Sequence, residues 1–328
     1  MNVLSLFDGM SCGQIALDQL GIPVNNYYAS EIDKYAIQIA KKNYPNTIHL
    51  GDVTKVKGED LEKIDLLLGG SPCQGFSFAG KQLNFNDPRS ALFFEYVRLL
   101  KECNPKYFLL ENVRMKKEYQ DVITEHLGVE PITINSALVS AQNRVRLYWT
   151  NIPNITQPED RGIVLKDIVE EMPVNTSNTF TEKQSNNNNE KPMQIGMADN
   201  INGHDILKRI YSSEGKSPTL NAHGGGNTEP KIACGALRGR QITPGSKEYT
   251  QMLELREDNK TNTLTSVQKD NVLTQDKMYY RKLTPLECER LQTVPDGYTE
   301  GVSNTQRYKM LGNGWTIEVI KHVLQNIT

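Results

Sequence analysis

The sequence predicts an α/β protein built on a Rossmann-like, doubly wound and mostly parallel sheet, with a smaller, loop-rich second domain. In the first half of the chain, short apolar runs alternate with segments of helical period, as in strands joined by crossover helices. After about residue 170 the sequence becomes polar and loop-like, and strong helical signals return only near the C-terminus. This change in sequence pattern predicts the two domains.

Five apolar runs are predicted strands, at residues 3–7, 24–30, 65–68, 107–110 and 147–150. Three intervening segments carry apolar residues at helical spacing and are predicted helices, at residues 14–20, 34–43 and 91–102. Strands and helices in this order imply a sheet covered on both faces. Ligands of such sheets bind beyond the carboxyl ends of the strands.

The C-terminal part holds two further predicted helices. Thr284, Pro285 and Glu287 form a capping-box pattern that starts a helix ending near residue 292. Residues 315–324 place apolar side chains on one helical face, which suits packing on a sheet.

The predicted domains follow from this change in pattern. Residues 1–172 form the first domain, which the C-terminal segment 307–328 completes. Residues 173–192 are polar and form a linker, and residues 193–306 form the second domain and a hinge.

Composition narrows the function classes. The formal net charge of -2 gives no global sign of a polyanionic partner, but residues 204–247 hold seven basic and three acidic side chains. That excess fits either a solvated basic face or a local anion-binding surface. Five cysteines without a CxxC pair indicate neither a disulfide framework nor a zinc site. The N-terminus has no basic leader and no apolar run is long enough to span a bilayer, so a cytoplasmic protein without membrane contact is expected.

A candidate cofactor site follows the first predicted strands. The turn LFDGMSCG leads into a helix and lets a ligand approach the backbone, but it fits neither GK[ST] nor GxGxxG. Glu31, at the end of the second strand, can accept both hydroxyls of a ribose. Asp52, in LGDVT, is a further strand-end carboxylate. The pair suits a ligand with a ribose and an amino-bearing base, although turn acids that cap helices would give the same pattern.

A candidate reactive group lies in GGSPCQGFSF, which directly follows an apolar run. Pro72 and the two glycines shape the backbone so that the Cys73 thiol is accessible, and a thiolate is a strong nucleophile. Glu111 follows another strand in FLLENV, and Arg144 and Arg146 alternate in AQNRVRLYW. Alternate residues share one face, so both guanidinium groups could orient an anion or stabilise a thiolate.

Six motifs now resemble a known family. LFDGMSCG, GGSPCQGFS, ENV, QNRVR, RKLTPLECERLQ and LGNGWTIEVI occur in the order and spacing of cytosine-C5 DNA methyltransferases, over nearly the whole chain except about residues 170–280. FDGMSCG, RSALFFEYVRLL and the tryptophan after GNG look more like the animal de novo enzymes and their phage or bacterial relatives. Ser11 stands where many members have the second glycine of FxGxG.

The resemblance implies a class I methyltransferase fold and a DNA (cytosine-5-)-methyltransferase that uses S-adenosylmethionine. The catalytic residues would be Cys73, Glu111, Arg144 and Arg146, with Cys73 attacking C6 of a cytosine flipped out of double-stranded DNA and Glu111 bonding N3 and the exocyclic amine. The enzyme would act as a monomer on DNA, and residues 193–306 would recognise the target. The implied cofactor-binding residues are Phe7, Asp8, Gly9, Met10, Glu31, Ile32, Asp52, Val53, Pro72, Leu92, Asn313 and Trp315.

Within that set, the resemblance assigns separate tasks. Phe7, Pro72 and Leu92 would surround the adenine, whose amino group would donate to Asp52. Asn313 and Trp315 would close the methionine end.

Three alternatives remain beside this interpretation. An RNA methyltransferase of the same fold would share Cys73, Glu111 and the cofactor site, but the long insertion between QNRVR and RKLTP favours DNA. A catalytically inactive DNA-binding homologue would be expected to lose Cys73 or Glu111, and both are present. A structural α/β protein would carry these motifs by chance. The biological role stays open between protection against a partner nuclease, evasion of host restriction by a phage, and an orphan epigenetic mark.

Overall fold

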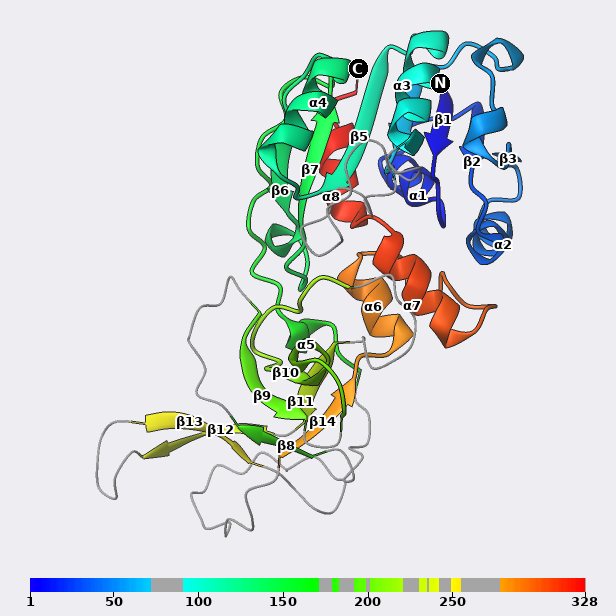
Figure 1. Cartoon of the computed structure of the whole chain (residues 1–328). Helices are drawn as coiled ribbons and strands as arrows, with labels where there is room; N and C mark the ends of the chain where they lie inside the picture. The colour runs from blue at the N-terminus through cyan, green and yellow to red at the C-terminus, as the bar shows by residue number, and fades with distance from the viewer. Residues whose placement is uncertain are drawn as a thin grey trace.

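The structure is a computed structural model, and it describes residues 1–71, 91–170, 179–182, 192–198, 201–220, 230–234, 236–241, 249–254 and 278–327. The described residues form a large α/β unit and a small β-barrel beneath it (Figure 1). Within these ranges, no helix combines the length and apolar character needed to cross a membrane.

A seven-stranded sheet of order β3-β2-β1-β4-β5-β7-β6 forms the centre of the large unit. Its strands are β1 (Asn2–Leu6), β2 (Asn26–Ser30), β3 (Ile48–His49), β4 (Leu66–Gly69), β5 (Tyr107–Val113), β6 (Ile132–Asn135) and β7 (Val145–Thr150). All pairs from β3 to β5 are parallel, and only β7 runs antiparallel to its two neighbours. The order runs outward in both directions from β1 and β4, which confirms the predicted doubly wound sheet.

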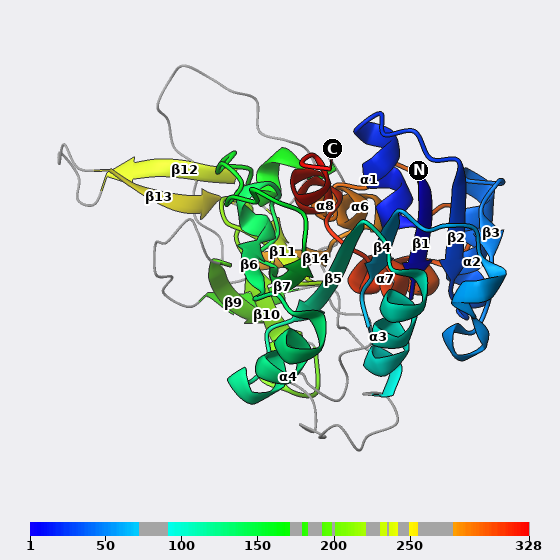
Figure 2. The same ribbon diagram turned by 90° about the horizontal axis from the view of Figure 1, so that it is seen from above.

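Helices cover both faces of this sheet because its strands bury alternate residues on opposite sides. Leu66 and Leu68 pack with the helices α1 (Cys12–Gln19), α2 (Lys34–Asn43) and α8 (Ile317–Leu324). Leu67 packs with α3 (Ala91–Cys103) and α4 (Lys117–Leu127) on the other face. Figure 2 shows the two layers from above. The last helix, α8, thus packs on the sheet of the large unit.

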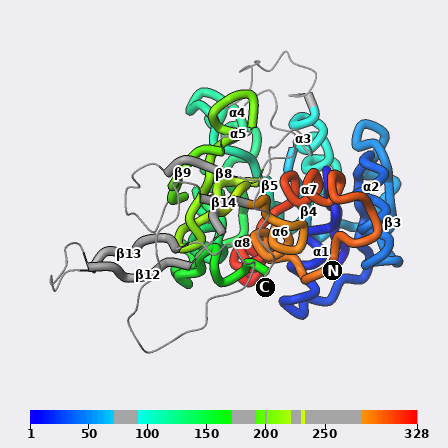
Figure 3. Tube along the Cα trace, turned by 90° about the horizontal axis from the view of Figure 1, so that it is seen from below, coloured from blue at the N-terminus to red at the C-terminus, as the bar shows by residue number. Residues whose placement is uncertain are grey.

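Two helices lie between the sheet and the barrel (Figure 1), and seen from below they lie in front of β1 and β4 of the sheet (Figure 3). They are α6 (Pro285–Leu291) and α7 (Asn304–Asn313). The capping box of α6 is confirmed, because Thr284 Oγ1 accepts from the Glu287 amide at 3.1 Å and the Glu287 carboxylate accepts from the Thr284 amide at 2.8 Å. α7 was not predicted from the sequence.

The barrel closes in the order β10-β11-β14-β8-β9. Its strands are β8 (Thr179–Glu182), β9 (Gln194–Ala198), β10 (Arg209–Tyr211), β11 (Lys231–Cys234) and β14 (Met278–Lys282). The remaining elements are α5 (Asp205–Lys208), the paired strands β12 (Ala236–Gln241) and β13 (Tyr249–Glu254), and the short 3-10 helices η1 (Val53–Lys55), η2 (Gly58–Asp60), η3 (Ser136–Leu138) and η4 (Leu165–Asp167). β8 lies inside the segment 173–192 that was expected to be a linker. The domain limits at residues 172, 192 and 307 stay predictions.

A buried polar cluster ties together the two places where the chain passes between the units. Glu287 is fully buried, and its carboxylate accepts from Arg281 at 2.6 and 2.8 Å and from the Glu170 amide at 2.7 Å. Arg281 also donates to the Glu170 carbonyl at 3.1 Å. These bonds therefore fix Glu170, where the chain leaves the large unit, to Arg281 and Glu287, where it returns from the barrel.

Candidate active site

A pocket of about 350 Å³ opens at the carboxyl edge of the sheet. Eight of the residues that the sequence analysis assigned to a cofactor line it: Phe7, Gly9, Glu31, Ile32, Asp52, Val53, Leu92 and Asn313. Nine further lining residues were not assigned to a cofactor: Ser30, Asp33, Ala36, Gly51, Gly70, Ser71, Gln306, Lys309 and Met310. Phe7 follows β1, Ser30 ends β2 and Gly70 follows β4, so the pocket lies where ligands of doubly wound sheets bind.

The turn after β1 contains Ser11 at the position of the motif's second glycine. Phe7, Gly9 and Ser11 have φ values of 57°, 59° and 66°, in the left-handed region that favours glycine. Ser11 is fully buried, and its hydroxyl donates to the Asp8 carboxylate at 2.6 Å. Tyr27 donates to the same carboxylate at 2.7 Å. Asp8 therefore lies behind the turn and holds it, and burial raises its pKa to about 6.

Glu31 joins the ends of the first two strands. Its carboxylate accepts three backbone N–H bonds, from Gly9 at 2.8 Å and from Ile32 and Asp33 at 2.7 Å each. Glu31 Oε2, which accepts from Gly9, can also accept from a ligand hydroxyl, because a carboxylate oxygen accepts two bonds. Asp52 accepts from the amide and the hydroxyl of Thr54 at 3.0 Å each, and these bonds lower its pKa. Both carboxylates are thus held in place.

The opposite wall of the pocket comes from α7. Lys309 donates to Asp33 at 2.6 Å, and the other oxygen of Asp33 caps α2 through the Tyr35 amide at 2.9 Å. Apart from Asn313, this wall was not predicted, because α7 has no strong apolar stripe. The helix-start position of Asp33, two residues after Glu31, was the available signal.

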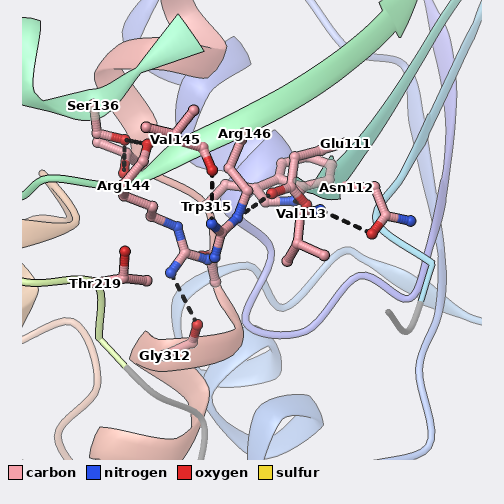
Figure 4. Close-up of polar contacts among 12 residues, drawn as sticks. Glu111, Asn112, Val113, Ser136, Arg144, Val145, Arg146, Thr219, Gly312 and Trp315 are labelled. Carbon is pink, nitrogen blue, oxygen red and sulfur yellow. Dashed lines mark hydrogen bonds and ion pairs between the residues drawn. The ribbon is translucent and has the colours of Figure 1, made fainter. Parts of the chain in front are cut away.

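Glu111 ends up beside this pocket with both oxygens bonded (Figure 4). Its Oε1 pairs with Arg146 Nε at 2.9 Å, and its Oε2 accepts from the indole Nε1 of Trp315 at 3.1 Å. Glu111 and Trp315 are both buried. Trp315 is therefore placed against the candidate acid and does not line the pocket, and Met10 is buried in the core behind it.

The two arginines of QNRVR make different contacts. Arg146 faces Glu111, whereas Arg144 is buried and donates to the carbonyls of Gly312 at 3.2 Å and Gly314 at 2.8 Å (Figure 4). Burial, and then the positive charge of Arg146, lower the pKa of Arg144 to about 10. Arg144 thus holds the chain between α7 and α8.

Gly70 lines the pocket and also lies next to Glu111. A Cβ at this position would lie 3.0 Å from Trp315 Nε1 and 3.3 Å from Glu111 Oε2, so a side chain would crowd their contact. The hydroxyl of the next residue, Ser71, accepts from the side-chain amide nitrogen of Asn112 at 3.2 Å. Pro72 and Cys73 lie outside the described residues, but the chain leading to them runs along the Glu111 site.

Together, the strand order 3-2-1-4-5-7-6, the strand-end carboxylates and the adjoining acid define a Rossmann-like α/β enzyme of the class I methyltransferase type.

Comparisons with known proteins agree with that class. A family model described as C-5 cytosine-specific DNA methylase matches residues 1–328. The orphan methyltransferase M.SPBetaI of Bacillus phage SPbeta is 28% identical over 433 residues, which cover 100% of this chain and 97% of the relative. The type II methyltransferase M.HhaI of Haemophilus parahaemolyticus is 27% identical over 353 residues, which cover 100% of this chain and 94% of the relative.

Solved structures show the same fold. The Entamoeba histolytica methyltransferase EhMeth matches with a TM-score of 0.67 and 17% identity, over 99% of this chain and 97% of that chain. The S. pombe Dnmt2 methyltransferase matches with a TM-score of 0.62 and 15% identity, with the same coverage. The chain therefore belongs to the C-5 cytosine-specific DNA methylase family, and it is a DNA (cytosine-5-)-methyltransferase.

Proposed function

We propose that the chain transfers a methyl group from S-adenosylmethionine to C5 of a cytosine flipped out of double-stranded DNA, with Cys73 as nucleophile and Glu111 as the acid that binds the base. The observation that carries this proposal is the position of Glu111, which lies next to the pocket and next to the chain that leads into Cys73. Nucleophile, acid and methyl donor would then share one edge of the sheet.

The pocket fits the proposed methyl donor by the chemistry of its walls. Glu31 offers a fixed acceptor for ribose hydroxyls, and Asp52 offers one for an adenine amino group. Phe7 and Leu92 supply apolar surface for the base, and Asn313 lies on the α7 side. When bound, S-adenosylmethionine supplies an electrophilic methyl group on a sulfonium.

Unactivated C5 of cytosine is a poor nucleophile, so covalent activation is needed. The Cys73 thiolate would add to C6 and produce an enamine, whose C5 is nucleophilic enough to take the methyl group as the methyl–sulfur bond of the sulfonium breaks and a neutral thioether leaves. Glu111, as a carboxylic acid, would donate to N3 and accept from the exocyclic amine, and so stabilise the charge that develops on the ring. Loss of the C5 proton and elimination of the thiolate release 5-methylcytosine and the free enzyme.

Reaction at C6 requires the base to leave the duplex, at a cost of a few kcal/mol. We assign residues 193–306 to target recognition, where phosphate contacts would give affinity and base contacts would give specificity. The enzyme is proposed to act as a monomer on DNA, in the cytoplasm of a bacterial or phage-infected cell.

The proposal is tested by expressing the chain in cells and sequencing their DNA after bisulfite treatment. We expect 5-methylcytosine at one recurrent site, and none with the Cys73→Ser variant. Purified Cys73→Ser should still bind S-adenosylmethionine in calorimetry. In a tritiated-methyl assay with duplex DNA and transfer RNA in competition, label should enter the DNA. Label in the RNA instead would replace this proposal with the RNA methyltransferase.

A further inference from the structure

Trp315 forms a hydrogen bond that it would not need if it only lined the cofactor pocket. Its indole Nε1 donates to Glu111 Oε2 at 3.1 Å, while Arg146 Nε bonds Oε1 at 2.9 Å from the other end of the carboxylate (Figure 4). An indole N–H can only donate, and each carboxyl oxygen can accept a second bond. Both oxygens are thus held, and the carboxyl group in its acid form can still donate from one oxygen to N3 of a base and accept from the exocyclic amine at the other.

The indole is itself fixed by its surroundings. The Trp315 amide donates to the Cys12 sulfur at 3.4 Å, and the preceding carbonyl, of Gly314, accepts from Arg144 at 2.8 Å. A Cβ at residue 314 would lie 2.9 Å from Met10 Cε and 3.2 Å from Cys12 Sγ, so glycine lets the chain pass close to the core there. Buried Arg144 therefore positions the segment that carries Trp315.

A carboxyl group turns easily about its last side-chain torsion, which is broad and two-fold. Glu111 has to bond N3 through one oxygen and the exocyclic amine through the other, so its plane must match the plane of the base. With Arg146 on Oε1 as its single donor, the carboxyl group could still rotate about this torsion. The second donor, Trp315 on Oε2, prevents that rotation.

We infer that Trp315 is a positioning residue for methyl transfer, and that its indole N–H fixes the carboxyl plane of Glu111 for a two-point contact with cytosine. This inference rests on the proposed role of Glu111. It differs from the assignment of Trp315 to the methionine end of the cofactor, because it predicts an effect on the reaction rate and none on cofactor affinity.

The test uses duplexes that contain the site found by bisulfite sequencing. The target base is either 5-fluorocytosine, which offers N3 and an amine, or 2-pyrimidinone, which lacks the amine. Rates of covalent adduct formation are measured at saturating S-adenosylmethionine for the wild type and Trp315→Phe. A second variant carries 3-benzothienylalanine at this position, which keeps the bicyclic shape and loses only the N–H. The matched control is Trp149→Phe, since Trp149 is a buried tryptophan whose indole donates to Thr124 at 3.0 Å, away from the pocket.

Loss of one hydrogen bond to a charged group should slow adduct formation on 5-fluorocytosine by about 10- to 100-fold in both Trp315 variants. The slowing should be much smaller on 2-pyrimidinone, because a one-point contact tolerates rotation of the carboxyl group. The calorimetric Kd for S-adenosylmethionine should not change. Trp149→Phe should leave the ratio of the two rates as in the wild type.

Equal slowing on both bases would show a packing role and overturn the inference. A raised cofactor Kd with an unchanged rate at saturation would return Trp315 to the cofactor wall. A Glu111→Gln variant distinguishes failure of the proposed role of Glu111 from failure of the inferred role of Trp315. If Glu111→Gln reacts like the wild type, the proposed function of Glu111 fails. If only Glu111→Gln is slow, the role of Trp315 fails and that of Glu111 stands.

Discussion

Lys309 and Asp33 form an ion pair of 2.6 Å that joins α7 to the start of α2 on the wall of the pocket. We predict that Lys309→Met weakens binding of S-adenosylmethionine by up to about fivefold, the range of a partly exposed pair. Calorimetry at low and high salt checks this, because screening should shrink the difference between variant and wild type.

Lys42→Met is the matched control for that measurement. Lys42 also joins α2 to the chain before α7, through the Glu300 carbonyl at 2.9 Å, but it does not line the pocket. Its loss should leave the Kd unchanged. Equal affinities of Lys309→Met and wild type at low salt would show that the pair does not support the wall.

Glu31→Gln should weaken binding of S-adenosylmethionine by about 10- to 100-fold, because an amide presents only one acceptor oxygen to bonds made to a charged carboxylate. At least one of the amides of Gly9, Ile32 and Asp33 would lose its acceptor. Calorimetry measures the change. Glu62→Gln is the control, since Glu62 accepts from Asn2 and Asn26 at the opposite ends of β1 and β2. Similar losses in both variants would point to a general effect on the fold.

Asp8 should make stability depend on pH. Its folded pKa of about 6 lies above the ordinary 3.8, so the folded state binds the proton more tightly than the unfolded state. The resulting stabilisation is complete below pH 3.8 and is lost as the pH rises to 6. Relative to Asp8→Asn, which does not titrate, the wild type should lose about 3 kcal/mol across that window. Urea denaturation at a series of pH values measures it, and a constant difference between the two proteins would contradict it.

Glu287→Ala should lower the free energy of unfolding by about 3–5 kcal/mol, because it leaves buried donors without their acceptor. Arg281 and the amides of Glu170 and Thr284 would all be affected. Glu318→Ala removes a more exposed carboxylate that pairs with Lys321 and Arg161, and should cost at most about 1 kcal/mol. Denaturation curves of the two variants would refute the prediction if their midpoints coincided.

The sequence predicted the strands with long apolar runs and the helices with a clear stripe. β3, which has only two residues, was implied by the strand-end position given to Asp52 but received no bounds, and β6 was missed. The prediction also missed α4, although Tyr119, Ile123 and Leu127 recur there at helical spacing. α7 was missed because its sequence NTQRYKMLGN is largely polar, and such a helix is fixed by tertiary contacts, which local periodicity does not record. β8 shows the same limit, since a polar segment forms a strand once the barrel supplies its neighbours.

For the site, residues that follow strands were predictable because parallel strands end at one edge. Glu31 and Asp52 belong to this group, whereas Glu111, which was predicted to follow a strand, lies inside β5 and pairs with Tyr148 of β7. The partners of Trp315 and Arg144 were not predictable, because the direction of an indole or a guanidinium group depends on packing between α7, α8 and β5. Cys73 was singled out by its sequence context alone and stays a prediction.

The central claim is that the sulfur of Cys73 becomes bonded to C6 of an extruded cytosine. Mass spectrometry of the protein incubated with S-adenosylmethionine and a duplex carrying 5-fluorocytosine at its target site tests it most directly, since fluorine blocks the final elimination. We predict a species with the summed mass of protein, modified strand and one methyl group, and its absence in Cys73→Ser. Failure to detect that species, while calorimetry shows a bound methyl donor and the unmodified duplex is methylated, would contradict the mechanism.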